Sequence, residues 1–178
     1  MPTGNPEAIL REWFSNPDRW WTPDPEFDSH LRAAHADDVE AALRGELDAW
    51  ARTPRGALAL VIVLDQIARN IHRGTARMYA GDAKALATCL AVIDSGADAS
   101  LSEDERQFLY MPLMHSEDRA LQMRSLDKFR ELSQGLDYAE QHAKIVFRFG
   151  RFPHRNAILE RASTPEEIEF LKQPGSSF

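Results

Sequence analysis

Three polar segments, far apart in the sequence, carry the side chains that could bind or transform a ligand. Residues 65–73 read DQIARNIHR, residues 115–118 read HSED, and residues 148–156 read RFGRFPHRN. The third segment gathers three arginines, a histidine and an asparagine in a chain whose formal net charge is -7. Such a local cluster of cations calls for a local partner, which is either a small anion or the protein's own carboxylates.

The residue types in these segments favour recognition of an anion. Arginine binds carboxylates and phosphates through paired hydrogen bonds, and asparagine or glutamine amides orient what is bound. Histidine titrates near neutral pH without help, so His115 and His154 are the first candidates for acid–base catalysis, followed by Asp65. No catalytic nucleophile can be assigned from sequence. The predicted ligand-binding set is Asp65, Gln66, Arg69, Asn70, Arg73, His115, Glu117, Arg151, His154, Arg155 and Asn156.

A purely structural role for the same charges is the alternative. Asp65 and Arg69 are four residues apart, which is the spacing of an ion pair that braces one helix. The arginines of residues 148–156 could likewise pair with acids such as Glu117. His142 shares a helical face with apolar side chains, which indicates a core histidine. At the level of sequence, a ligand site and a salt-bridge network both stay open.

The elements that must position these residues are helices. Apolar residues recur at three and four positions, and no segment alternates as a strand would. Capping side chains stand directly before proline at Asn5, Asp24, Thr53 and Thr164. The sequence therefore predicts one all-α domain over residues 1–178, with frayed ends at about 1–5 and 173–178. About eight helices are expected, at 6–15, 25–44, 54–73, 76–95, 103–113, 116–133, 137–149 and 157–172, the last with a break at Ser163 as an alternative.

Short connections between these helices favour antiparallel hairpins in a bundle or a superhelix. The first half of the helix over 54–73 is apolar on all sides, which predicts a central position. Pro112 should end or kink the helix over 103–113. Ser116 is the expected N-cap of the next helix, with Glu117 in its first turn. Backbone N–H groups of a helix starting near Asn156 would add to the anion site.

Composition excludes several classes of function. The chain has 178 residues, and its longest apolar run, residues 57–64, is far shorter than the ~20 residues of a membrane helix. The excess of acidic over basic residues argues against nucleic-acid and membrane partners. A single cysteine, Cys89, excludes an internal disulfide and a multi-cysteine zinc site, and its surroundings indicate the core. With no signal-peptide pattern, we expect a cytoplasmic protein.

No metal site or cofactor is predicted. His30 and His35 precede two aspartates, but five-residue spacing points the two imidazoles away from each other on a helix. The glycine-rich nucleotide motifs, the zinc-protease motif and the serine-hydrolase motif do not occur in the sequence.

Three ordered stretches make a family resemblance specific: LDQIARNIHRGTARMYAGDAKALA (residues 64–87), FLYMPLMHSED (108–118) and FGRFPHRNAILERASTPEE (149–167). From about Trp13 to Leu171 the chain resembles the bacterial family known as domain of unknown function 924. The resemblance implies an all-helical fold of the tetratricopeptide-like superhelix type. The chain departs from the family pattern at Ile67, Ala68 and His72, and Glu160 stands where glycine is usual.

The leading hypothesis is a site, shared by the three polar segments, for a small anionic ligand, with phosphorylated molecules among the candidates. A protein- or peptide-binding module is the competing class, which the tetratricopeptide-like fold favours by analogy. A hydrolase using His115 or His154 as acid or base is a further alternative, and so is a purely structural network. The sequence does not determine an oligomeric state.

Overall fold

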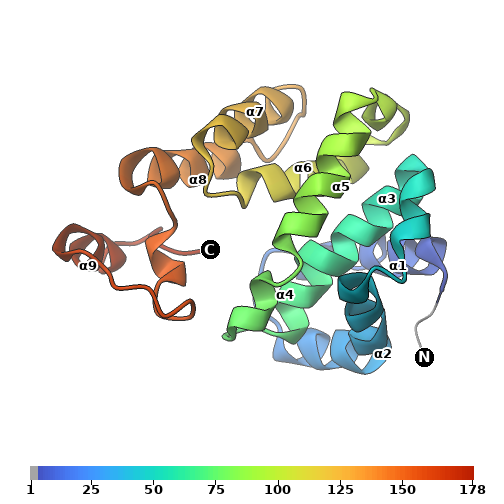
Figure 1. Ribbon diagram of the computed structural model, residues 1–178, viewed down its shortest axis with the longest axis horizontal. Coiled ribbons are helices and arrows are strands. Elements are labelled where there is room, and N and C mark those ends of the chain that lie inside the picture. Colours follow the sequence, from blue (N-terminus) through green and yellow to red (C-terminus); the bar gives the residue numbers. More distant parts are fainter. Residues whose placement is uncertain (1–3) are drawn as a thin grey trace.

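Residues 4–178 are described by the computed structural model, and within that range all regular secondary structure is helical (Figure 1). The α-helices are α1 (Pro6–Phe14), α2 (Pro25–Arg44), α3 (Pro54–Val61), α4 (Ala68–Ile71), α5 (Asp82–Asp94), α6 (Glu103–Met114), α7 (Arg119–Phe129), α8 (Leu136–Phe149) and α9 (Pro165–Leu171). Short 3-10 turns join several of them. The all-α prediction is confirmed.

Local sequence signals set several helix ends. The side chains of Asn5, Asp24, Thr53 and Thr164 each accept a backbone hydrogen bond from the first turn of the helix that follows. Proline occupies the first turn in all four cases, where its missing N–H has no consequence. At the other end, α2 closes on Gly45 with a φ of 87°. These ends therefore need no tertiary contact to be specified.

The segment from α3 to α4 forms the centre of the molecule. Its first half is buried on every side, as the sequence predicts. It packs against α1 and α2 on one side and against α5 and α6 on the other. In Figure 1 it crosses between α2 below and α5 above. Cys89 of α5 is also fully buried, as predicted. The polar residues that follow the apolar half of this segment thus emerge from the middle of the core.

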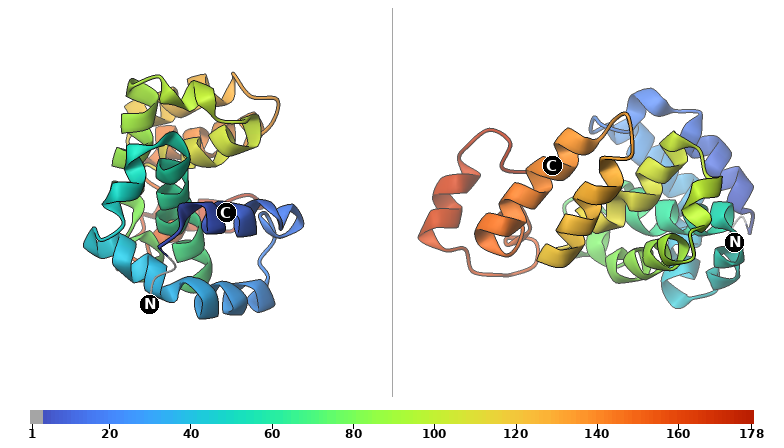
Figure 2. Two further views of the ribbon diagram at one scale, coloured as in Figure 1. Left: turned by 90° about the vertical axis from the view of Figure 1, so that its right-hand side faces the viewer. Right: turned by 90° about the horizontal axis from the view of Figure 1, so that it is seen from above.

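The C-terminal part of the chain folds back toward that centre. Helices α7 and α8 pack side by side, α9 lies beyond them, and the chain then returns to the middle of the molecule (Figures 1 and 2). In the tail, for which fraying is predicted, the hydroxyl of Ser176 donates to the carbonyl of Leu171, and the Phe178 ring stacks on His142. Of the N-terminal end predicted to fray, residues 1–3 lie outside the described range.

Three predicted helix boundaries are wrong, and each error has a local cause. The helix expected over 76–95 begins at Asp82, after a 3-10 turn over Ala76–Tyr79. Gly81 separates the two because it lies directly against the carbonyl of Leu64. A Cβ at this position would come under 3.0 Å from that oxygen. The chain therefore leaves the helical path here to pack closely on the central segment.

The helix expected to start at Ser116 starts at Arg119, and Asp118 is its N-cap. The Asp118 carboxylate accepts from the N–H groups of Ala120 and Leu121. Ser116 instead accepts from the N–H of Asp118. Because Glu117 is consequently outside the helix, its carboxylate is free to bind a distant part of the chain.

The helix expected over 157–172 is α9 alone, which begins at Pro165, just after the break at Ser163 that the sequence offers as an alternative. Residues 153–155 form a 3-10 turn, and the chain then turns until Glu160, which has a φ of 54°. No helix begins near Asn156, so the expected row of N–H groups at that position does not exist. Pro112 lies inside α6, which continues to Met114. Burial of this stretch of α6 offsets the hydrogen bond that proline removes.

Within residues 4–178, no helix is both long and apolar enough to cross a lipid bilayer.

Candidate functional site

A cavity of about 400 Å³ lies where the three polar segments approach one another. Helices α4, α6 and α8, the 3-10 turns after α4 and α8, the loop before α2 and the C-terminal tail all contribute to its wall. From the predicted ligand-binding set, the lining residues are Gln66, Arg69, Asn70, Arg73, His115, His154 and Arg155. We refer to this space as the central cavity. The tertiary structure thus brings together predicted residues that are up to 89 positions apart in the sequence, from Gln66 to Arg155.

Asp65 and Gln66 lie in a π-helical segment, Ile62–Ile67, between α3 and α4. A π-helix is rare, and its wider turn is found disproportionately at functional sites. The sequence predicts one regular helix over residues 54–73. The π-helical turn has no signal of its own there, because over so short a stretch its residues have the same apolar periodicity as an α-helix.

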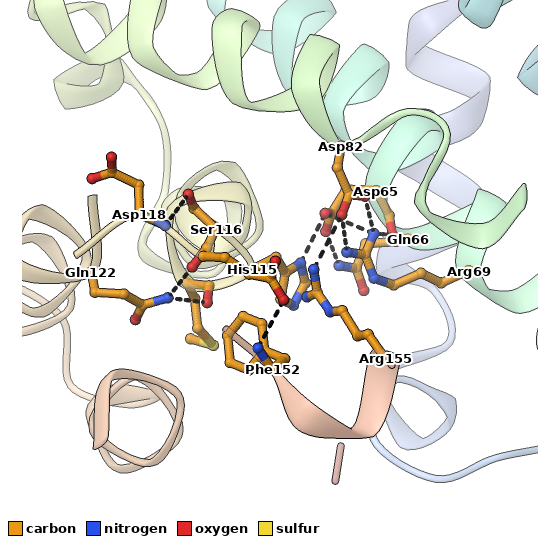
Figure 3. Close-up of polar contacts among 12 residues, drawn as sticks. Asp65, Gln66, Arg69, Asp82, His115, Ser116, Asp118, Gln122, Phe152 and Arg155 are labelled. Carbon is orange, nitrogen blue, oxygen red and sulfur yellow. Dashed lines mark hydrogen bonds and ion pairs between the residues drawn. The ribbon is translucent and has the colours of Figure 1, made fainter. Parts of the chain in front are cut away.

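Asp65 is the hub of the polar contacts at the base of the central cavity (Figure 3). Its fully buried carboxylate accepts from the Arg69 guanidinium at 2.9 Å, from His115 Nδ1 at 2.8 Å and from the Gln66 amide. Burial alone would raise the pKa of Asp65, but Arg69 and His115 outweigh it and hold that pKa well below its usual range. The carboxylate is therefore ionised at neutral pH.

His115 presents an unbonded nitrogen to the central cavity. Its Nδ1–H donates to Asp65, so Nε2 carries the lone pair, and within residues 4–178 no hydrogen bond reaches Nε2. Burial lowers the pKa of His115, and Arg69 lowers it further, against the opposing effect of Asp65. The imidazole is therefore neutral near pH 7 and able to accept a proton. This is the arrangement of a histidine base oriented by a carboxylate.

Arg155 is a buried cation that lacks hydrogen-bond partners. Its side chain is 9% exposed, and its guanidinium carbon lies 4.8 Å from the centroid of the Tyr79 ring and 4.4 Å from that of the Phe152 ring. Its closest carboxylate, Asp82, is 3.7 Å away. No described residue accepts a hydrogen bond from the Arg155 guanidinium, and its Nε atom is fully buried. Burial and the positive charge of Arg69 lower the pKa of Arg155, although arginine stays protonated.

Asp82 lies between the two arginines of the central cavity. Its Oδ2 accepts from Arg69 at 3.0 Å, whereas its approach to Arg155 is too long for a hydrogen bond. Burial raises the pKa of Asp82, and the neighbouring Asp65 raises it further, against the attraction of Arg69. Asp82 therefore balances part of the charge of Arg155 without occupying its donors.

Two more histidines line the central cavity. The Nδ1–H of His142 donates to the carbonyl of Tyr138 at 2.8 Å, and burial lowers the pKa of His142 to about 3. His142 is buried, as the sequence predicts, but it is also part of the cavity wall. Burial and the neighbouring Arg155 lower the pKa of His154 to about 4. Its buried Nδ1 has no hydrogen-bond partner among the described residues.

Four residues of the predicted set do not line the central cavity: Asp65, which is buried beneath its wall, and three that hold the C-terminal segment, the part of the chain after α8, in place. Arg151 makes two hydrogen bonds to Glu167, at 2.6 and 2.7 Å. Asn156 also donates to Glu167, at 3.3 Å. Glu117 pairs with Arg161 at 2.7 and 2.9 Å and accepts from the N–H of Phe152. These contacts match the structural alternative. Two of the partners, Arg161 and Glu167, are not among the residues predicted from the sequence.

At the rim of the central cavity, Asn70 and Arg73 both bind Asp28 of α2. Asn70 donates at 2.8 Å and Arg73 at 2.8 and 3.1 Å. The charge of Arg73 is therefore already balanced by a carboxylate.

Tyr79 and Asp82, which complete the surroundings of Arg155, are not among the residues predicted from the sequence. Both lie in the RGTARMYAGD stretch that carries the family resemblance, and this was the one signal that could have identified them. In residues 4–178, no cluster of three or more histidine, cysteine, aspartate or glutamate side chains is arranged to hold a metal ion.

Comparison with known proteins places this geometry in a family. The sequence model of "Bacterial protein of unknown function (DUF924)" matches residues 9–175. The chain belongs to this family. The solved structure of ATU0120, a protein of unknown function from Agrobacterium tumefaciens, is 44% identical and superposes with a TM-score of 0.89. The match covers 94% of this chain and 96% of that one. No protein with a curated description matches significantly.

The predicted family is thereby confirmed. The tetratricopeptide-like superhelix, which the resemblance implied, is named neither by the family description nor by the solved structure, and it stays a prediction.

Proposed function

We propose that this DUF924 protein binds a small anion in the central cavity, with Arg155 as the principal contact. The observation that carries the proposal is the Arg155 guanidinium, which is nine-tenths buried yet makes no hydrogen bond to any described residue. Burying a charge without hydrogen bonds costs several kcal/mol by order of magnitude. A carboxylate or phosphate group offsets that cost by accepting from the guanidinium edge.

The two aromatic rings around Arg155 support this role. Tyr79 and Phe152 both make cation–π contacts with the guanidinium and restrict its position, while its N–H groups stay without a hydrogen-bond partner among the described residues. In this proposal, Gln66, His115 and His154 orient the anion from the cavity wall, and Asn70 and Arg73 lie at its mouth. Arg69 and Asp65 set the position and charge of His115. Glu117, Arg151 and Asn156 position the segment that carries Arg155.

Thermal unfolding of the wild type and of Arg155→Met, with and without anions, tests the proposal. Phosphate and small carboxylates are expected to stabilise the wild type, and the variant should bind them at least about tenfold more weakly, as expected for a charged hydrogen bond. Without ligand, the variant should be as stable as the wild type or more so, because a poorly paired buried charge has been removed. The matched control is Arg148→Met, which removes an exposed arginine paired with Glu166.

Two results would contradict the proposal. One is a wild type that no anion stabilises. The other is an Arg155→Met variant that binds anions normally or that is strongly destabilised without them, which is the outcome for a bracing residue.

A second candidate function is hydrolysis, favoured by the Asp65–His115 contact. In this scheme Nε2 of His115 takes a proton from a water molecule as that water attacks an acyl or phosphoryl group held at Arg155. The ester bond to the alcohol oxygen then breaks, and His115 returns the proton to that departing oxygen. His115→Gln should abolish any such turnover while anion binding persists. A panel of phosphate and carboxylate esters provides the assay, and turnover retained in His115→Gln excludes this role for His115.

The peptide-binding alternative has no comparable observation in its favour. Arg73, Arg148 and Arg151 do not offer free charges along a groove, because each is paired with a carboxylate of the chain.

A further inference from the structure

The central cavity has a second, apolar part of its wall that an inorganic anion would not use. Besides the charged groups, the lining contains aromatic and sulfur-bearing side chains: Trp20, Trp21, Met78, Met111, Met114, Phe129 and Tyr138. These come from the loop before α2, from the turn before α5, and from α6, α7 and α8. Aromatic and methionine side chains around a few polar groups are typical of a site for an organic ligand.

Trp21 is the most exposed large side chain in this part of the wall. It is 48% exposed, its ring stacks on Phe108 at 5.8 Å, and Tyr138 lies nearly parallel to it at 6.1 Å. The adjacent Trp20 is fixed, because its indole N–H donates to the carbonyl of Trp13 and its ring packs edge-on against Phe108. A well-supported aromatic surface is therefore left partly in water at the cavity.

The cavity already accepts one flat ring from the chain itself. Phe178, which is 51% exposed, lies face to face with His142, with ring centroids 3.7 Å apart and planes 15° from parallel. His142 in turn lies 5.8 Å from His115, so this stack adjoins the polar base of the site. Planar groups can thus enter next to the charged residues.

The size of the cavity agrees with an organic ligand. Since a water molecule occupies roughly 30 Å³ of liquid, the 400 Å³ cavity is much larger than a bare phosphate or acetate requires. Such an ion at Arg155 would leave the aromatic wall solvated.

We infer that the anion bound at Arg155 carries an aromatic ring, which packs against Trp21 and Tyr138, so that the ligand class is an aryl phosphate or aryl carboxylate. This inference rests on the proposed function, since the anionic group fixes the ligand and the ring adds affinity. Trp21 is then a specificity-determining residue. It discriminates ring-bearing anions from bare ones and does not bind the charge.

Matched probes measured by titration calorimetry test the inference. Phenyl phosphate is compared with inorganic phosphate, and benzoate with acetate, so that the two kinds of anionic head are distinguished. The ring-bearing member of the better pair should bind wild type about tenfold more tightly or better. Trp21→Ala should remove most of that gain and leave the affinity for the bare anion unchanged. Trp21→Phe should restore much of it, and Met123→Ala, an exposed apolar residue outside the cavity, serves as control.

Equal affinity for the two members of both pairs would overturn the inference while leaving the anion site intact. An equal loss of both members in Trp21→Ala would overturn it too, because the effect would then be on folding and not on ring recognition. Phenol is the uncharged ring in this set of probes. If phenol binds and no anion does, both the proposed function and this inference fail.

Discussion

Arg151 and Arg155 are one helical turn apart in sequence and have opposite surroundings. Arg151 is partly exposed and makes two hydrogen bonds to Glu167, whereas Arg155 is buried and makes no hydrogen bond to a described residue. Both are arginines of the same polar segment, so the residue type does not distinguish them. Only their surroundings separate a bracing arginine from one that is available to a ligand. The same holds for the acids, since Glu117 pairs with Arg161 and Asp65 orients His115.

Glu160 is the residue for which backbone strain is clearest. It is the one non-glycine residue in the described range with a positive φ, 54°. The left-handed conformation costs a non-glycine residue about 1–2 kcal/mol. Glycine avoids this cost but loses more conformational entropy on folding, which cancels part of the gain. Glu160→Gly should therefore raise the free energy of unfolding by about 0.5–1 kcal/mol, measured by urea denaturation.

Glu160→Ala is the control for that measurement. Alanine removes the charge and keeps the left-handed strain, so no stabilisation is expected. A gain as large in the alanine variant would show that charge, and not backbone strain, is responsible.

At the scale of elements, the π-helical segment Ile62–Ile67 and the start of α5 depend on each other. Gly81 precedes α5 and lies on the carbonyl of Leu64, inside the π segment. This contact places Asp82 beside Arg69. The position of one small residue thus determines which carboxylate reaches the arginines of the central cavity.

Gly81→Ala tests this packing. The added methyl group would meet the Leu64 carbonyl, so the free energy of unfolding should fall by about 1–3 kcal/mol, the usual cost of overpacking. Gly96→Ala is the comparison, since Gly96 has open space around its Cα and only a positive φ to maintain. Gly96→Ala should itself cost about 1–2 kcal/mol through that φ, so a Gly81→Ala variant with the same free energy of unfolding as the wild type would show that the close contact with Leu64 has no energetic weight.

At the scale of the whole molecule, the C-terminal segment contributes to the wall of the central cavity and is held by partly buried ion pairs. The Glu167 side chain is 3% exposed, and its carboxylate accepts hydrogen bonds from the side chains of Arg151 and Asn156 and from the backbone N–H of Thr164. The bonds from Arg151, followed by the Thr164 N–H, lower the pKa of Glu167 to about 2. Glu117 anchors the same segment to the start of α7.

This arrangement makes docking of the segment sensitive to acid. The folded-state pKa of Glu167 is below its ordinary value of 4.5, so its stabilisation is complete above about pH 5 and is lost as the pH falls toward 2. Glu167→Gln should destabilise the protein by about 2–3 kcal/mol at pH 7. The difference in Tm from wild type should shrink between pH 4.5 and pH 2. Circular dichroism melts across this range provide the measurement.

Glu166→Gln is the matched control, because Glu166 is an exposed neighbour whose pair with Arg148 should contribute about 0–1 kcal/mol. A Glu167→Gln difference that does not change with pH would show that the carboxylate charge is not what holds the segment.

The sequence by itself determined the helical class, the family and the start of most helices. These depend on short-range physics: apolar periodicity, a capping side chain before proline, and a glycine that accepts a left-handed φ. It also identified the three polar segments, and with them seven of the residues that line the central cavity. All of that information lies within a few residues of each position in the chain.

The tertiary structure alone decided which polar residues share the cavity and which hold the chain in place. Burial and the presence of a partner are long-range properties: Arg155 lacks hydrogen bonds because Asp82 is 3.7 Å away, and Arg151 has them because α9 brings Glu167 to it. The π-helical turn and the aromatic wall around Trp21 likewise arise from packing between distant segments. Propensity is encoded locally, whereas desolvation and pairing of charge are fixed only when the chain has folded.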